Sequence, residues 1–81
     1  MKYIATFYSH FGALRFKKQC DQRGMEAKLM PVPRDLSSSC GTCVLYEGEG
    51  EEGRTQWPQE LEQAARVLPE GYRVFYRAEN S

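Results

Sequence analysis

Four short segments of the chain are dominated by apolar, aromatic and β-branched residues, and each predicts a β-strand. They are residues 2–8, 26–30, 42–46 and 72–76. The first segment combines aromatic and apolar side chains with the β-branched Thr6, a composition that strands favour. Pro31 and Pro33 end the second segment, because proline cannot donate to the hydrogen bonds between strands. The hydrophobic pattern therefore predicts a sheet of four short strands.

Two further segments have the spacing of amphipathic helices. In the first, Ser9 is a good N-cap, helical character extends from residue 10 to about 22, and Gly24 ends it. Ala13, Phe16 and Cys20 share one face of this helix. In the second, Pro58 suits the first turn of a helix that extends to about residue 68. Its apolar face is Leu61, Ala64, Ala65 and Leu68.

The predicted order is β-α-β-β-α-β, which is the ferredoxin-like arrangement of the α+β class: an antiparallel four-stranded sheet with two helices on one face. We expect a single domain over residues 1–77 and a frayed tail over residues 78–81. In this topology the start of the first helix, the 31–41 loop and the 69–71 turn meet at one edge of the sheet. Cys20 and the glycine-rich acidic segment 47–53 lie at the opposite edge. Cys40 is therefore expected near the N-terminus of the first helix.

Composition and charge narrow the function. The chain has 81 residues, 41% of them hydrophobic, and its 11 basic and 11 acidic residues give a formal net charge of zero. One small core is the most that this length allows. A neutral chain lacks the positive field of a typical nucleic-acid binder. No apolar run reaches a membrane span of about 20 residues, and no signal-peptide profile precedes the first strand, so we expect a cytoplasmic protein.

The 31–41 loop is long for so small a domain and carries the most suggestive chemistry. Cys40 follows Ser37, Ser38 and Ser39 and precedes Gly41, an arrangement in which backbone N–H groups can turn toward an anion or a thiolate. The start of the first helix, Arg34 and His10 could stabilise that thiolate, and the serine hydroxyls could donate to it. The alternative is a serine-rich turn in which Cys40 only packs.

This loop, with its prolines, Arg34, its serine triplet and Cys40-Gly41, resembles the signature of the selenium/sulfur carrier protein-like family of small bacterial and archaeal domains. The resemblance covers residues 3–45 well and the remainder in outline. It implies a protein whose Cys40 carries sulfur or selenium as a persulfide or selenosulfide. The chain departs from the family pattern in the acidic segment 47–53, in Cys43, and in Cys20, where a larger aliphatic residue is expected.

Cys40 and Cys43 also form a C-x-x-C pair, the spacing of dithiol redox sites and of half a zinc site. If the strand begins at Thr42, the two Cα atoms are about 10 Å apart, beyond the limit of roughly 7 Å for a disulfide. Cys43 is then a packing residue of the strand. A zinc site would need His10 and Cys20 as well, and Cys20 is expected at the far edge. We predict no metal site.

Three functions follow from these observations. The first is a carrier, rather than a turnover enzyme, that needs no cofactor and passes sulfur or selenium from a donor protein to an acceptor protein. Cys40 would carry the atom, supported by His10, Arg34, Cys43 and the residues from Ser37 to Gly41. The second is an interaction module without chemistry, binding through the open sheet face or the sheet edges, including as a homodimer. The third is a dithiol redox protein using Cys40 and Cys43.

Overall fold

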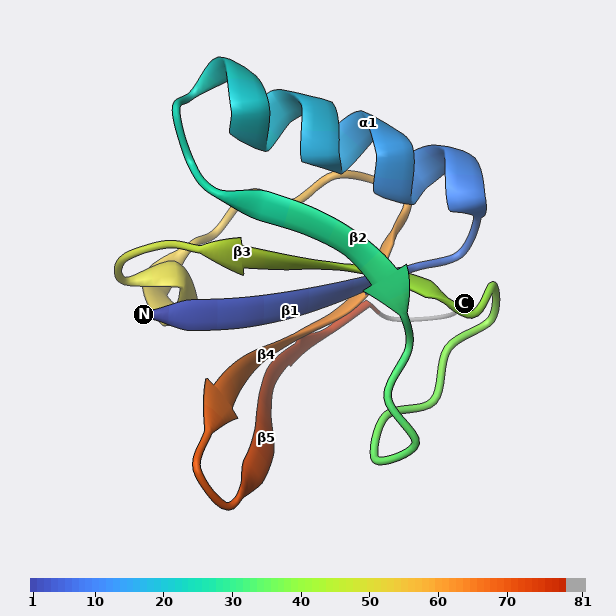
Figure 1. The fold of residues 1–81 in the computed structure, drawn as a ribbon, viewed down its shortest axis with the longest axis vertical. Coiled ribbons are helices and arrows are strands. Elements are labelled where there is room, and N and C mark those ends of the chain that lie inside the picture. Colours follow the sequence, from blue (N-terminus) through green and yellow to red (C-terminus); the bar gives the residue numbers. More distant parts are fainter. Residues whose placement is uncertain (79–81) are drawn as a thin grey trace.

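The computed structural model describes residues 1–78, which form one antiparallel sheet of five strands and one α-helix packed on one of its faces (Figure 1). The strands are β1 (Lys2–Phe7), β2 (Ala27–Pro31), β3 (Thr42–Glu47), β4 (Leu61–Leu68) and β5 (Gly71–Arg77). The helix is α1 (His10–Gln22), and a short 3₁₀ turn, η1, spans Glu51–Gly53. The strand order is β2-β3-β1-β4-β5, with β1 in the centre.

The predicted first helix is confirmed. Ser9 has extended backbone (φ −140°, ψ 154°), and its Oγ accepts the N–H of Gly12 at 3.1 Å. This bond satisfies one of the free N–H groups of the first turn. Ala13, Phe16 and Cys20 are buried against the sheet, as their spacing predicts. The predicted strands within residues 2–47 are also present, with ends that differ by one residue.

The predicted second helix is wrong: the segment forms β4, with no helix over residues 58–68. The ferredoxin-like fold with two helices and four strands is wrong for the same reason. β4 lies between β1 and β5, and Gln63, Ala64 and Ala65 are all buried, so both of its faces are covered. A strand buried on both faces does not alternate apolar and polar residues, and small apolar residues at helical spacing then resemble a helix.

The new strand changes which loops meet. β4 is antiparallel to β1 and joins β5 in a hairpin, so the 69–71 turn lies at the edge of the sheet where β1 begins. The prediction that this turn lies beside the start of α1 is therefore wrong. The start of β4 and the end of β5 take its place. Residues 32–41, which we call the cysteine loop, lie at the edge where α1 begins and cover part of the sheet face opposite α1 (Figure 1).

The core has one layer on each face of the sheet. Between the sheet and α1 the layer is aromatic: Phe16 packs edge-on against Tyr46, with ring centroids 5.1 Å apart, and against Phe7 at 5.3 Å. On the opposite face Ile4, Cys43 and Ala65 are buried together with Leu36 of the cysteine loop. The loop is thus tied to the fold by a buried side chain, which fixes where its remaining residues lie.

The acidic segment is bonded to the sheet through η1. A carboxylate oxygen of Glu51 accepts the hydroxyl of Tyr46 at 3.0 Å, and Glu52 accepts the hydroxyl of Tyr3 at 2.7 Å. Burial raises the pKa of Tyr46 well above its usual value, so this tyrosine stays protonated and donates. Two glutamates therefore satisfy tyrosines whose rings belong to the core.

Candidate functional site

The cysteine loop begins and ends at one point of the sheet. The N–H of Val32 donates to the carbonyl of Gly41 at 3.1 Å and closes the neck of the loop, and the N–H of Leu36 donates to Pro33 at 3.0 Å inside it. Gly41 has φ +76°, a conformation that side chains disfavour, so glycine suits the residue directly after Cys40. The neck, the inner turn and buried Leu36 define a single path for the loop.

The side of the loop that carries Cys40 is held by the start of β4. Oε1 of Glu62 accepts the N–H of Ser39 at 3.2 Å and the hydroxyl of Thr6 at 3.2 Å, and its Oε2 accepts the hydroxyl of Ser39 at 2.7 Å. The amide of Gln63 donates to the carbonyl of Ser37 at 2.6 Å. The residue before Cys40 is therefore bound to a central strand by a carboxylate, which makes stronger hydrogen bonds than a neutral group.

A β-bulge directs both side chains to the loop. Thr6 pairs with Gln63 while Phe7 pairs with Leu61, so Glu62 is the extra residue on β4. The sequence interpretation missed Glu62 and Gln63 because it assigned them to a helix. Because the strand is buried on both faces and bulged at Glu62, its sequence carries no regular alternation that could have identified it.

Cys40 is partly exposed, whereas Cys20 and Cys43 are buried. Its N–H donates to Oγ of Ser38 at 3.4 Å, and its Sγ donates to the carbonyl of Thr42 at 3.5 Å. Both contacts are long and local, so the thiol is presented at the surface rather than packed in the core.

The first residue of α1 also lies at this edge. Nδ1 of His10 is 3.1 Å from Oγ1 of Thr42, whose carbonyl accepts the Cys40 thiol. Cys40 and the start of α1 are thus linked through Thr42, which contacts both the Cys40 thiol and the His10 ring. The His10 side chain is exposed, so its ring also faces solvent.

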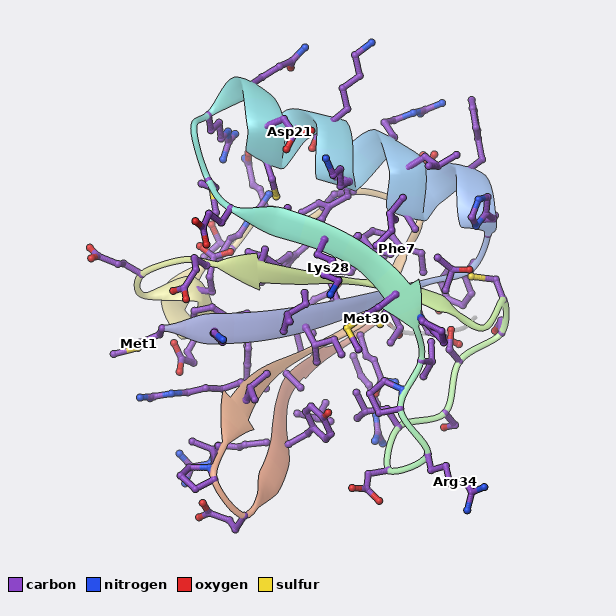
Figure 2. The ribbon with its side chains drawn as sticks, in the orientation of Figure 1. Met1, Phe7, Asp21, Lys28, Met30 and Arg34 are labelled. Carbon is purple, nitrogen blue, oxygen red and sulfur yellow. The ribbon has the colours of Figure 1, made fainter. Side chains whose placement is uncertain are left out.

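Two other expected supports of the thiol are used differently. Arg34 lies at the outer turn of the cysteine loop and points away from the sheet, and no ion pair joins it to another described residue (Figure 2). The hydroxyls of Ser38 and Ser39 donate to the carbonyl of Phe7 and to Glu62, not to Cys40. The described hydrogen bond of Ser37 is made by its carbonyl, which accepts the amide of Gln63. The structure therefore brings Ser38, Ser39 and Gly41 to Cys40, and leaves Arg34 apart.

The remaining cysteines have different surroundings. The Cys43 thiol donates to the carbonyls of Met30 and Pro31 at 3.5 and 3.6 Å, and burial, with a smaller effect of Cys40, raises its pKa to about 11. Burial also raises the pKa of Cys20. All three cysteines are free thiols. Within residues 1–78, no group of three or more His, Cys, Asp and Glu side chains could hold a metal ion.

These features define a small α+β domain that presents one surface cysteine on an anchored loop. Residues 2–70 match the profile of the family described as "Putative Se/S carrier protein-like", and the chain belongs to this family.

One curated protein is similar to this chain in sequence. The chain is 33% identical over 57 residues to "Uncharacterized protein YtiA" of Escherichia coli (strain K12). The match covers 69% of this chain and 65% of the relative, so it spans less than two thirds of that protein. No solved structure matches the chain. Over residues 1–78, α1 is too short and too polar to cross a membrane.

Proposed function

We propose that the protein carries sulfur or selenium on Cys40, as a persulfide or selenosulfide, between a donor protein and an acceptor protein. The observation that carries this proposal is the contrast among the three cysteines: Cys40 alone is partly exposed, and its loop is bonded to β4 on the residue before it. A carried sulfur must be reachable by two partners in turn, which buried Cys20 and Cys43 are not. Membership of the family supports the same chemistry.

The transfer is a thiol exchange that balances without a redox co-reactant. The Cys40 thiolate attacks the terminal sulfur of a donor persulfide, E–S–SH. A bond forms between Sγ and that sulfur, the donor S–S bond breaks, and its electron pair leaves with the donor thiolate, E–S⁻. A donor selenosulfide, E–S–SeH, reacts in the same way at selenium. The acceptor thiolate then attacks the terminal atom on Cys40 and restores the free thiol.

The surrounding residues have distinct supporting roles in this proposal. Glu62 and Gln63 hold residues 37–39 and so limit the positions that the Cys40 thiol can occupy. His10, next to Thr42, is a candidate for exchanging a proton with the thiol through solvent. A reducing compartment, the cytosol, suits a carrier whose cysteines are free.

Mass spectrometry tests the proposal. The protein is incubated with a cysteine desulfurase and cysteine, or with a low-molecular-weight selenosulfide, and its intact mass is measured without reductant. We expect one added sulfur or selenium atom, released by dithiothreitol. The adduct is expected to be absent in Cys40→Ser and retained in Cys20→Ser.

Comparing the wild type with Cys43→Ser separates the carrier from a dithiol redox protein. A carrier keeps its adduct in Cys43→Ser, whereas a dithiol protein would instead form a Cys40–Cys43 disulfide in the wild type. Equal labelling of all three cysteines, or an adduct that survives in Cys40→Ser, would contradict the proposal.

A further inference from the structure

Two apolar side chains on the outer face of α1 have no role in the core. Phe11 is 64% exposed and Leu14 is 42% exposed, and with Met1 they are the exposed large hydrophobic residues among those described. They are three positions apart and therefore adjacent on the helix surface. The helix already buries Ala13, Phe16 and Cys20 toward the sheet, so its packing does not require an apolar outer face.

This apolar pair lies at the same end of the molecule as Cys40. Phe11 directly follows His10, whose ring contacts Thr42, and Leu14 is one helical turn further on. Figure 1 shows the first turn of α1 and the end of the cysteine loop on one side of the molecule, with the N-terminus and η1 on the other. A protein that covers Phe11 and Leu14 therefore binds at the end of the molecule that carries Cys40.

Two basic side chains, Arg15 and Lys18, lie on the same face of α1 as the pair. The Arg15 guanidinium lies 4.9 Å from the centre of the Phe11 ring and also pairs with Glu60 at 3.1 Å. Lys18 is exposed, and no ion pair is found for it within residues 1–78. The acidic segment with Glu51 and Glu52 lies at the other end of the sheet. An exposed aromatic ring with an arginine stacked on it is a composition typical of binding hot spots.

We propose that Phe11, Leu14, Arg15 and Lys18 form the docking surface for the protein that donates sulfur to Cys40. The donor meets it with an apolar surface that carries acidic side chains, because complementary charges orient the encounter. The inference rests on the proposed function and adds where the donor binds.

The experiment compares a protein donor with a small one. Sulfur loading of Cys40 is timed by mass spectrometry with a cysteine desulfurase and cysteine, and separately with inorganic polysulfide, which needs no docking surface. The wild type is compared with the double variant Phe11→Ser/Leu14→Ser and with Lys18→Glu. The control is Lys28→Glu, on the face of β2 opposite α1 (Figure 2). Circular dichroism melting confirms that each variant is folded.

With the desulfurase, loading is expected to be about tenfold slower in the double variant, the size of effect that loss of a hot spot gives. Lys18→Glu is expected to slow loading and to weaken its dependence on salt. Loading by polysulfide should be unchanged in every variant, and Lys28→Glu should match the wild type with both donors.

Three results would overturn the docking proposal. The double variant could load from the desulfurase at the wild-type rate. Alternatively, the wild type could load no faster from the desulfurase than from polysulfide. Sedimentation could instead show a dimer that the double variant abolishes, in which case the patch binds a second copy of this chain. Failure of the proposed function is distinct, because no adduct specific to Cys40 would then form in the wild type with either donor.

Discussion

Glu62 is the side chain that most directly determines where the Cys40 thiol lies. Its carboxylate accepts three hydrogen bonds, two from Ser39 and one from Thr6. Thr6 belongs to the central strand, and Ser39 is adjacent to Cys40. One residue therefore couples the loop to the most buried part of the sheet, and Leu36 adds an apolar anchor on the same loop.

Removing this carboxylate is expected to release the loop while leaving the fold intact. In Glu62→Ala, the buried hydroxyl of Thr6 loses its acceptor together with the exposed hydroxyl and N–H of Ser39, and the free energy of unfolding should fall by about 1–3 kcal/mol. Hydrogen exchange at Ser39 and the rate of Cys40 alkylation should both rise, because the loop then opens more often. Amide exchange measured by NMR and timed alkylation test this.

Glu60→Ala is the matched control for that variant. It removes a carboxylate two residues away, whose ion pair with Arg15 is exposed and worth about 0–1 kcal/mol. Unchanged exchange at Ser39 in Glu62→Ala would show that the loop is held by other contacts.

At the scale of elements, the approach of α1 to the start of β4 brings the helix N-terminus to the cysteine edge. Gly12, in the first turn of α1, faces Glu60, and a Cβ atom built on Gly12 would lie 2.6 Å from the Cβ of Glu60. The absence of a side chain lets the two segments pack closely. Glu60, which fixes the position of the helix, and Glu62, which anchors the loop, are therefore two residues apart on the same segment.

Gly12→Ala is expected to destabilise the protein, although alanine is the better helix former by about 1 kcal/mol. Overpacking against Glu60 should lower the free energy of unfolding by about 1–3 kcal/mol, as measured by urea denaturation. Gly53→Ala is the control, because a Cβ atom there meets nothing within 4 Å. A Gly12→Ala protein more stable than the wild type would show that Glu60 moves aside at little cost.

At the scale of the whole molecule, the two ends of the sheet have different roles. One end carries the cysteine loop and the start of α1, and the other carries η1 with its two glutamates bonded to core tyrosines. The acidic end is structural in the first place, because its carboxylates satisfy hydroxyls of the core.

The acidic end is expected to make stability depend on pH. The hydrogen bond from Tyr3 lowers the pKa of Glu52. A hydrogen bond from the backbone of Glu52 and the nearby Arg66 lower it by smaller amounts. Because this pKa is lower in the folded protein than in the unfolded chain, the ionised carboxylate stabilises the fold at pH values above the pKa of the unfolded chain, about 4.3. That stability is lost as the pH falls through the folded value. The urea midpoint should therefore decrease on acidification below about pH 5.

Glu52→Gln should make that decrease smaller, since the amide does not titrate. Glu49→Gln is the control: it removes a charge from the same acidic segment, at an exposed residue. If the pH dependence of the urea midpoint were the same in Glu52→Gln as in the wild type, the Tyr3–Glu52 bond would not be its source.

The sequence alone determined the features that depend on local patterns. The cap at Ser9, the stripe of Ala13, Phe16 and Cys20, and the strands within residues 2–47 follow from short-range spacing and backbone preferences. The cysteine loop and its family resemblance follow from a contiguous motif, and the family is confirmed. The role of Cys40 remains a proposal on which the motif and its partial exposure agree.

Only the tertiary structure decided the identity of β4 and the residues around Cys40. Residues 61–68 have a helical spacing that strand pairing on both sides overrides, because a central strand gains hydrogen bonds and burial on two faces. That pairing brings Glu62 to Ser39 across 23 positions of the chain. It also leaves Arg34 at the outer turn of the loop (Figure 2). Contacts between distant segments arise from packing the whole sheet, and local spacing does not encode them.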